Sequence, residues 1–532
     1  MNFQMDNMYL RPNVQVEPLI DHWYAWPHLI PPATAARNLT ERHAKIMQSY
    51  ITAPQIHANA VKNPKMLGGP FIDYGGERVQ EIKDLLANTL RERACVVALS
   101  KALEELDRML QSKATGESLH PLYAQIPPIL KGYVELFYDL NNHPSFRILE
   151  SLLYRSEFYV RDSQSLMLSR ITGDDRPFVL STPRLPNDGT VHLQMPFADE
   201  SVDYLFSAKL DAKPVGELME RCGVSAADAD LFQSFFTAHA PQRYCPYRGK
   251  GVRWRYFGHA CILLETPTLS LLFDPVLSYT YESGISRYTY DDLPEKIDYV
   301  LITHNHQDHV LLETLLQIRH KVSSIVVPRS GGGALQDPSL KLTLENIGFR
   351  NVIELDELEM MDCECGSITG LPFLGEHADL NVRSKLAYLV NLGGHKLLFA
   401  ADSCNIEPAL YRQLQRHIGD VRALFVGMEC DGAPLTWLYG PLLTRRIERG
   451  QDESRRLSGS NFAQAIEIVN ALNCKEVFIY AMGQEPWLNY VMSIKYTPES
   501  NPIVQSNKLI ETCRERGIVA ERLFGEREML LD

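Results

Sequence analysis

The sequence predicts an α/β protein with two domains, an α+β accessory domain at residues 1–245 and a layered α/β domain at residues 246–532. Three observations support this fold class. The chain has 532 residues, more than a single domain usually holds. The first half carries mixed signals, with helix-period hydrophobic patterns that give way to a shorter, strand-like period. After Gly251, short apolar strands alternate with turns and helices.

The first half opens with an arm rich in proline and aromatic residues and continues with helices. Apolar residues recur every three to four positions over residues 77–111, which predicts an amphipathic helix with one interruption. Residues 178–180 and 191–193 flank an Asn-Asp-Gly turn sequence and predict a β-hairpin. A last helix is expected over residues 214–239. Dimerisation, partner docking and covering of an active site are the roles expected for this domain.

The second half has the pattern of an α/β layered domain. The expected strands are residues 252–257, 260–265, 269–274, 299–303, 324–327, 386–391, 396–400, 423–427 and 477–481. The expected helices are residues 311–319, 408–417 and 461–472. Strands that alternate with helices in this way predict sheets covered by helices.

Composition excludes several classes of protein. Hydrophobic residues make up 45% of the chain and charged residues 22%, which is ordinary for a globular protein and unlike a disordered or fibrous one. The formal net charge of −13 argues against nucleic acid as the main partner. The sequence shows neither a signal peptide nor a membrane-spanning run, so we expect a cytoplasmic protein without membrane contact. The ten scattered cysteines are expected to be reduced packing residues.

The most informative segment is Thr-His-Asn-His-Gln-Asp-His at residues 303–309, directly after a predicted strand. Three imidazoles and a carboxylate are costly to cluster without a metal ion, because cationic imidazoles repel and unpaired polar groups must be satisfied. His304 and His306 lie two apart on an extended loop and can bind one ion, which leaves Asp308 and His309 for a second. The alternative is a polar surface turn, although histidine-rich tracts usually bind metal.

The pattern His-x-His-x-Asp-His after a hydrophobic strand resembles the signature loop of the metallo-β-lactamase fold. The segments around His259, Asp274 and Asp402 also resemble this family, in its lactonase-like branch. The resemblance covers about residues 250–532 and implies an αββα sandwich with two metal ions. It implies that Asp402 bridges the ions and that Asp274 orients a ligand. Alternatively, Asp402 caps a following helix.

Two departures from the hydrolytic members of that family bear on the function. Where those members have a further metal histidine, this chain has Glu376 followed by His377. The resemblance favours Glu376 as the ligand and leaves His377 as an alternative ligand or an orienting residue. The late histidine of many hydrolases is also absent, so a second ion would keep Asp308, His309 and Asp402 with open positions for water or oxygen.

Two histidines and one carboxylate are the ligand chemistry of oxygen-activating non-haem iron, and open positions favour a diiron pair over zinc. The plan of the whole chain resembles the dinuclear iron β-hydroxylases of chloramphenicol biosynthesis. This resemblance implies a monooxygenase with two iron ions that uses O2 and an external electron donor. It implies β-hydroxylation of an aromatic amino acid, L-p-aminophenylalanine, tethered through phosphopantetheine to a nonribosomal peptide synthetase carrier domain in antibiotic biosynthesis.

The same residues allow two other interpretations of the function and suggest a partner protein. The alternative activity is that of a dizinc hydrolase of the lactonase-like branch. A third interpretation is a scaffolding protein whose degraded metal site is structural. No flavin-phosphate loop is visible, so the electrons are expected from a separate reductase or ferredoxin.

Two further features of the second half suggest contacts with the substrate. Five arginines at residues 445–456 make a locally positive stretch, which could dock an acidic carrier domain or its phosphate, or form a solvated insertion with internal ion pairs. Several aromatic residues of the second half could line a substrate pocket or could pack in the core; they include Trp437, Tyr439, Tyr480 and Trp487.

Overall fold

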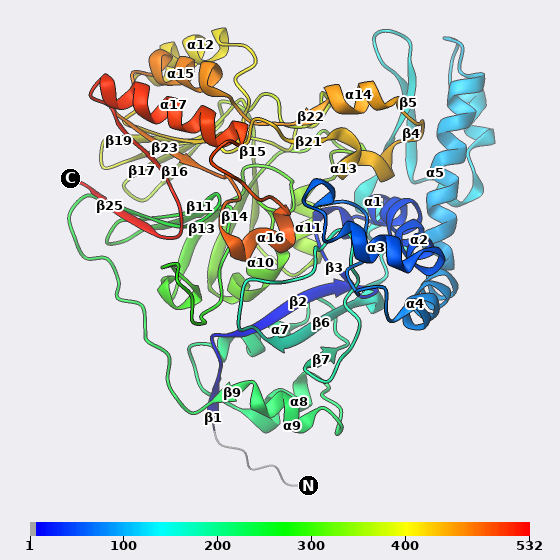
Figure 1. The fold of residues 1–532 in the computed structure, drawn as a ribbon. Helices are drawn as coiled ribbons and strands as arrows, with labels where there is room; N and C mark the ends of the chain where they lie inside the picture. The colour runs from blue at the N-terminus through cyan, green and yellow to red at the C-terminus, as the bar shows by residue number, and fades with distance from the viewer. Residues whose placement is uncertain (1–6) are drawn as a thin grey trace.

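The computed structural model describes residues 7–532, and its second half contains two seven-stranded sheets that pack face to face (Figure 1). The first sheet has the order β15-β14-β13-β12-β11-β10-β25 and the second β16-β17-β18-β19-β20-β23-β24. The first consists of β10 (Val252–Gly258), β11 (Cys261–Glu265), β12 (Ser270–Phe273), β13 (Ile297–Leu301), β14 (Val322–Pro328), β15 (Val352–Leu355) and β25 (Arg527–Leu531). The second consists of β16 (Met360–Cys363), β17 (Gly366–Leu371), β18 (Ala387–Leu392), β19 (His395–Phe399), β20 (Ala423–Gly427), β23 (Glu476–Tyr480) and β24 (Val519–Arg522).

Helices cover the outer faces of both sheets. Helices α10 (Leu312–Ile318) and α11 (Leu340–Asn346) pack on the first sheet. Helices α12 (Ala409–Ile418), α15 (Phe462–Ala471) and α17 (Asn501–Glu515) pack on the second. This arrangement is the predicted αββα sandwich, and every strand and helix predicted for the second half is present within a few residues of its expected ends.

The core between the sheets is aromatic. Trp254, Phe425 and Phe478 are fully buried there, and Phe273 stacks on Phe399 with ring centroids 3.9 Å apart. These residues alternate along their strands with residues that face the outer helices, as the two-residue period of a strand requires. Each aromatic ring removes roughly 150–250 Å² from water, so this layer is a major source of stability.

The first half is a mixed α+β region, as predicted. Its strands are β1 (Asn7–Leu10), β2 (Val14–Ile20), β3 (Trp23–Tyr24), β4 (Val134–Tyr138), β5 (Pro144–Ile148), β6 (Gln164–Arg170), β7 (Thr190–Leu193), β8 (Lys213–Pro214) and β9 (Phe236–Thr237). Its helices are α1 (Pro32–Asn38), α2 (Ala44–Thr52), α3 (Pro54–Ala60), α4 (Val79–Glu92), α5 (Ala94–Lys113), α6 (Glu150–Leu153), α7 (Glu200–Ser207), α8 (Val215–Arg221) and α9 (Ala229–Ser234). In the second half, a strand pair, β21 (Ala433–Pro434) and β22 (Arg456–Leu457), and helices α13 (Leu435–Tyr439), α14 (Arg449–Ser454) and α16 (Asn489–Met492) lie on the side of the sandwich that faces this region (Figure 1).

Three predictions for the first half have different outcomes. The interrupted helix over residues 77–111 is confirmed as α4 and α5, and the break is at Arg93, whose guanidinium pairs with Asp21 at 2.8 Å. The predicted hairpin is wrong: residues 178–180 form no strand, and β7 pairs with β6. Tertiary contacts explain the error, because Val179 N donates to the carbonyl of Tyr490 (2.9 Å). The last predicted helix is divided into α8 and α9, since Gly223 adopts a left-handed φ of 63° after α8.

The two halves share one continuous hydrophobic core, in which Trp26 and Leu205 of the first half belong to the same cluster as Leu315 and Leu435 of the second. A buried ion-pair network also joins them. Arg176 Nη2 lies 2.8 Å from Glu313 Oε2 and also pairs with Glu17, which in turn pairs with Arg184. The division of the chain at residues 245 and 246 stays a prediction; it lies within residues 238–251, which form neither helix nor strand.

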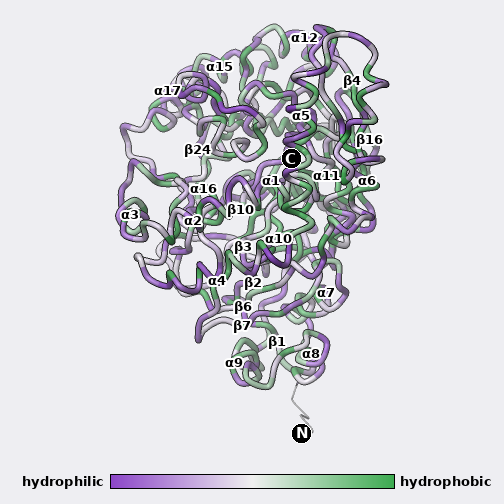
Figure 2. Tube along the Cα trace, turned by 90° about the vertical axis from the view of Figure 1, so that its right-hand side faces the viewer, coloured by the Kyte–Doolittle hydropathy of each residue, from purple (hydrophilic) through white to green (hydrophobic). Residues whose placement is uncertain are grey.

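No helix of residues 7–532 is both long and apolar enough to cross a membrane. In Figure 2, hydrophilic and hydrophobic residues alternate along most of the trace.

Candidate metal centre

The predicted ligands lie on three loops that meet at one edge of the sandwich. The loops follow β13, join β17 to β18, and follow β19. They carry, in this order, His304, His306, Asp308 and His309; Glu376 and His377; and Asp402. Backbone hydrogen bonds hold the loops together: Leu386 N donates to Thr303 O (2.7 Å), and Cys404 N donates to Leu374 O (2.8 Å).

One group of possible ligands consists of His304, His306 and Glu376. The distance from His306 Nδ1 to Glu376 Oε1 is 2.7 Å, and that from His304 Nε2 to Glu376 Oε2 is 3.6 Å. One ligand atom from each residue lies within 4.8 Å of the others, and all three side chains are buried. The structure therefore brings together the two-histidine, one-carboxylate set that the sequence predicted.

A second group gathers around His309. Its Nε2 atom lies 3.1 Å from Asp402 Oδ2 and 3.7 Å from Asp308 Oδ2. His304, His309 and Asp402 also form a group of possible ligands within 4.8 Å, so Asp402 lies between the two sets. The alternative that Asp402 caps a helix is wrong, because α12 begins only at Ala409, after Pro408.

Asp274 fixes the orientation of His309. The carboxylate follows β12, the parallel neighbour of β13, and accepts hydrogen bonds from Thr303 N (2.8 Å) and Thr303 Oγ1 (2.6 Å). Its Oδ2 atom is also 2.8 Å from His309 Nδ1. When the Nδ1–H group donates to Asp274, Nε2 is the nitrogen that faces the other carboxylates.

His377 lies beside the first group but outside it. Its Nδ1 atom is 3.1 Å from Glu376 Oε2, and its Nε2 atom is buried without a hydrogen-bond partner among the described residues. Glu376, not His377, belongs to a group of possible ligands. The choice between these two residues as the ligand stays a prediction.

Sequence reasoning missed His259 as a site residue. This histidine is fully buried, and its Nε2 atom lies 3.0 Å from Asp308 Oδ2. It also belongs with Asp308 and His309 to a third group of possible ligands. The signal was the Gly258-His259-Ala260 segment, where both Gly258 and His259 have positive φ at the end of β10.

The electrostatics of the cluster fit a bound cation. Burial lowers the pKa of His304 well below its usual range, which keeps its imidazole neutral, as a metal ligand must be. Burial also raises the pKa of Glu376 to about 7, although His306 opposes the shift. Burial would lower the pKa of His309, but the charges of Asp402, Asp308 and Asp274 outweigh it and raise this pKa well above its usual range.

Buried polar atoms without hydrogen-bond partners also indicate a bound cation. Buried polar atoms without a hydrogen-bond partner among residues 7–532 include His304 Nε2, Glu376 Oε2 and Asp402 Oδ1. Leaving such atoms unpaired is costly, and a metal ion would satisfy all of them at once. The residues present therefore fit a dinuclear metal centre.

A cavity of about 410 Å³ opens onto this cluster. Its polar end is formed by His306, Asp308, Glu376 and Asp402. The remaining wall is mixed. It has apolar side chains, Leu67 from the first half and Trp437, Leu457, Met492 and Ile494 from the second, and charged ones, Lys65, Glu429 and Arg456. The first half therefore contributes to the cover of the site.

Of the aromatic residues proposed to line a pocket, only Trp437 lines this cavity. Tyr439 lies behind the cluster, with its hydroxyl 3.1 Å from His306 Nε2. The Tyr480 hydroxyl accepts a hydrogen bond from Ala401 N (3.0 Å), and Trp487 packs against Gly258. For Tyr480 and Trp487 the core-packing alternative is therefore correct.

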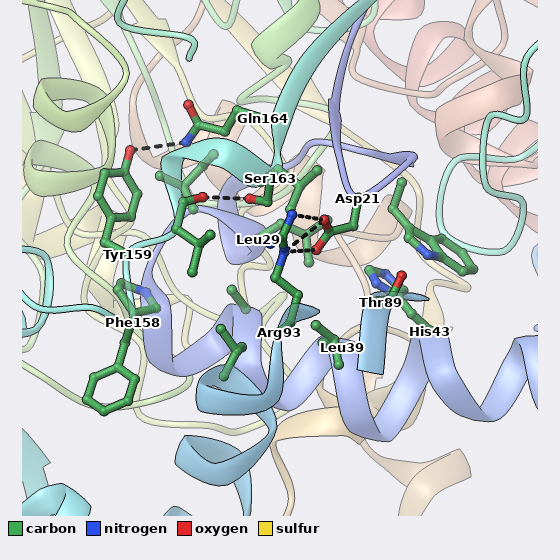
Figure 3. Close-up of a pocket in the computed structure, with 17 residues that line it drawn as sticks. Asp21, Leu29, Leu39, His43, Thr89, Arg93, Phe158, Tyr159, Ser163 and Gln164 are labelled. Atoms are coloured by element: carbon green, nitrogen blue, oxygen red, sulfur yellow. Dashed lines mark hydrogen bonds and ion pairs between the residues drawn. The ribbon is translucent and has the colours of Figure 1, made fainter. Parts of the chain in front are cut away.

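A separate, small cavity of about 50 Å³ lies within the first half, between β2 and the helices α1 and α5 (Figure 3). Its wall is largely apolar and is crossed by the ion pair of Arg93 with Asp21. His43, its one histidine, stacks on Trp23 with ring centroids 3.9 Å apart. This cavity holds no cluster of metal-ligating groups.

The five arginines at residues 445–456 separate in the structure. Arg449 pairs with Glu453 at 2.6 Å, and Arg455 Nε donates to the carbonyl of Ala378 (2.9 Å). Arg456 lines the metal cavity, whereas Arg445 and Arg446 are exposed. The stretch is thus a surface segment with one internal ion pair, between Arg449 and Glu453, and with exposed positive charge at Arg445 and Arg446.

Fold and site together define a dinuclear metalloprotein of the metallo-β-lactamase fold, and comparison with known proteins identifies its family. A family model described as the diiron non-heme beta-hydroxylase N-terminal domain matches residues 9–241, and one described as a beta-lactamase superfamily domain matches residues 270–476. The chain belongs to the family of diiron non-haem β-hydroxylases.

A similar protein is the 4-amino-L-phenylalanyl-CmlP-peptidyl-carrier-protein 3-hydroxylase of Streptomyces venezuelae. It is 40% identical over 529 residues, which cover 98% of this chain and 99% of that protein. The crystal structure of CmlA, a diiron beta-hydroxylase from the same organism, superposes with a TM-score of 0.94 over 99% of this chain and 100% of that one. The predictions of family, fold and enzyme class are confirmed, and the diiron hydroxylase is favoured over the dizinc hydrolase.

Proposed function

We propose that this protein hydroxylates the β-carbon of an aromatic aminoacyl group held as a thioester on a nonribosomal peptide synthetase carrier domain. The aminoacyl group is that of L-p-aminophenylalanine, and the pathway is one of antibiotic biosynthesis. The whole-chain similarity to the 3-hydroxylase of S. venezuelae carries this proposal, because it extends over both halves of the chain and includes the cover of the cavity.

We assign His304, His306 and Glu376 to one iron ion, Asp308 and His309 to the other, and Asp402 to a position between them. The two groups of closely spaced ligand atoms and their buried unpaired atoms support this assignment. The bound iron ions would supply activation of O2 with electrons from an external donor.

The chain's own residues position the cluster and the substrate. Asp274 holds His309 through its Nδ1 atom, and Tyr439 holds the ring of His306 through its Nε2 atom. The apolar part of the wall, with Trp437 and Leu67, excludes water around an aromatic ring. The cavity of about 410 Å³ lies in the range of small-ligand sites.

The partners of the enzyme belong to the same proposal. The carrier domain delivers the substrate, and a separate reductase or ferredoxin supplies the electrons. The exposed arginines Arg445 and Arg446 lie on the same surface segment as Arg456 at the cavity, which supports docking of an acidic carrier there. Homodimerisation through the first half is a further expectation.

The test is to express the protein in iron-supplemented medium, count metal ions per chain, and record the absorption spectrum during reduction and exposure to O2. About two irons per chain, together with hydroxylation of carrier-bound p-aminophenylalanine, would support the proposal. Two zinc ions that persist after iron reconstitution, with no O2 consumption, would overturn it in favour of a hydrolase.

A further inference from the structure

We propose that Glu429 binds the α-ammonium group of the tethered amino acid, an inference that rests on the function proposed above. Glu429 follows β20 and lines the metal cavity, together with three carboxylates already assigned to the cluster. It is the acidic side chain of this cavity that the metal centre does not use.

The position of Glu429 is close to the cluster. A Cβ atom added at Gly459 would lie 3.4 Å from the carbonyl oxygen of Asp402 and 3.5 Å from that of Glu429, so the two backbones are neighbours. A Cβ atom added at Gly427 would lie only 2.6 Å from Asp402 Oδ1. Glu429 therefore lies two residues along the chain from Gly427, whose backbone closely approaches the side chain of Asp402. Asp402 is the residue that we place between the two metal ions.

The carboxylate of Glu429 is held in one direction. Its Oε1 atom accepts a hydrogen bond from Gly432 N (2.8 Å), and its Oε2 atom accepts one from the Tyr496 hydroxyl (2.8 Å). Each oxygen keeps a further lone pair for a ligand in the cavity. The carboxylate is therefore preorganised rather than freely rotating.

Among the described residues Glu429 forms no ion pair, although two cationic side chains, Lys65 and Arg456, line the same cavity. The guanidinium of Arg456 donates instead to the backbone carbonyls of Asp431 and Gly432. Burial raises the pKa of Glu429, although the Gly432 and Tyr496 hydrogen bonds oppose the shift. A cation that enters the cavity would offset this cost of burial.

The substrate carries one cation suited to this site. In an aminoacyl thioester the carboxylate is esterified and the arylamine is neutral at pH 7, so the α-ammonium group is the charge that remains. The α-nitrogen is two bonds from the β-carbon, which means that its receptor must lie near the cluster, as Glu429 does. Binding there would fix the rotation about the Cα–Cβ bond and thus select which β-hydrogen faces the iron ions.

The test compares two loaded carriers on the iron-containing wild-type enzyme and on Glu429→Gln. One carrier bears p-aminophenylalanine, and the other bears 3-(4-aminophenyl)propionate, which lacks only the α-amine. A hydrogen bond to a charged group predicts that the substitution raises KM for the aminoacyl carrier on the order of ten- to a hundredfold. KM for the des-amino carrier and the iron content should stay unchanged. Glu476→Gln, at the far end of the neighbouring strand β23, is the matched control.

Equal loss on both carriers, or no loss on either, would overturn this inference while leaving the proposed function intact. Failure of the wild-type enzyme to act on the carrier-bound amino acid would overturn the proposed function and this inference with it. If Glu429→Gln does not fold, the wild-type enzyme decides alone: it should bind the aminoacyl carrier at least about tenfold more tightly than the des-amino carrier, and equal affinity would overturn the inference.

Discussion

Asp274 determines which nitrogen of His309 can face a metal ion. Its carboxylate accepts from both the backbone and the hydroxyl of Thr303, so it cannot rotate away from the imidazole. Residues of this kind do not bind the metal directly, yet they set the basicity and direction of a ligand.

We expect Asp274→Asn to weaken iron binding roughly ten- to a hundredfold, because the amide no longer holds the His309 Nδ1–H group with a charge. The measurement is iron per chain after dialysis against a chelator of known affinity. The control is Asp298→Asn. Asp298 lies at the start of β13, whereas the metal-binding loop follows the end of this strand, so this variant should keep its iron. Equal iron retention in both variants would contradict the orienting role.

The residues of the site differ in how far the sequence reveals them. His304, His306, Asp308 and His309 fall within six positions, and such local clustering is a strong signal by itself. His259 lies alone in the sequence, and only tertiary structure brings it to Asp308. Glu376 was found through its resemblance to a family pattern and not through ligand chemistry alone.

At the scale of elements, the loop between β17 and β18 stores backbone strain at the candidate ligand. Gly375, Glu376, Ala378 and Asp379 all have positive φ, between 51° and 73°. Three of these residues carry a Cβ atom, so each costs of order 1–3 kcal/mol that the surrounding contacts must offset. Sequence reasoning could not predict this shape, because the loop takes its conformation from contacts with distant segments such as residues 402–404.

We expect Gly375→Ala to destabilise the fold by about 2 kcal/mol or more and to reduce iron content. A Cβ atom there would add left-handed strain at φ 73° and would lie 2.5 Å from the Cβ of Cys404. Urea unfolding checks the stability. Gly394→Ala is the matched control, since it has a φ of 84° and no atom within 4 Å of the added Cβ; a loss as large as that of Gly375→Ala would show that strain alone is responsible.

The surface segment at residues 445–456 supports a further prediction. Arg445→Glu combined with Arg446→Glu should raise KM for a carrier-bound substrate several-fold at low salt, with less effect at high salt, because exposed charges mainly steer association. Steady-state kinetics at two ionic strengths checks it. Arg449→Glu, whose native partner is Glu453, serves as the control. Unchanged kinetics of the double variant would leave the segment as a solvated insertion.

At the scale of the whole molecule, the two halves also meet around buried lysines. Lys209 of the first half and Lys321 of the second lie over the ring of Tyr290, at 5.1 and 4.4 Å from its centroid. Burial lowers the pKa of each from 10.5 to about 8. The Nζ atom of Lys321 has no hydrogen-bond partner within the described residues.

We expect Lys321→Met to stabilise the protein at pH 7 by about 1–3 kcal/mol, since it removes a buried charge that has no hydrogen-bond partner among the described residues. Below pH 8 both the folded and the unfolded chains hold the proton, so the cost of burying it is fully present. Between pH 8 and 10.5 the unfolded chain holds a proton that the folded chain has lost, so the stability of the native protein rises with pH. Urea unfolding of both proteins across this window should show their difference shrinking; a constant difference would contradict the explanation.

The sequence predicted most of the sandwich because many of its strands are short apolar runs bounded by turns, and this signal is local. It predicted the first half less well, because contacts with Tyr490 set the conformation of residues 178–180 and their own β pattern does not. It also did not predict strands β15, β16, β17, β24 and β25, whose exposed or half-buried positions break up the apolar run, or helices α11 and α17. The shared core of the two halves is a property of the folded chain that no local pattern contains.

Strand β25 has a consequence for synthesis of the protein on the ribosome. It pairs with β10 from Val252↔Leu531 to Tyr256↔Arg527, so partners at one sheet edge are separated by more than half of the chain. While the intervening residues are translated, the outer edge of β10 stays unpaired, and an unpaired edge invites association with other chains. Contacts so distant in sequence also form slowly. The nascent polypeptide therefore passes through an interval in which molecular chaperones have a defined strand to protect.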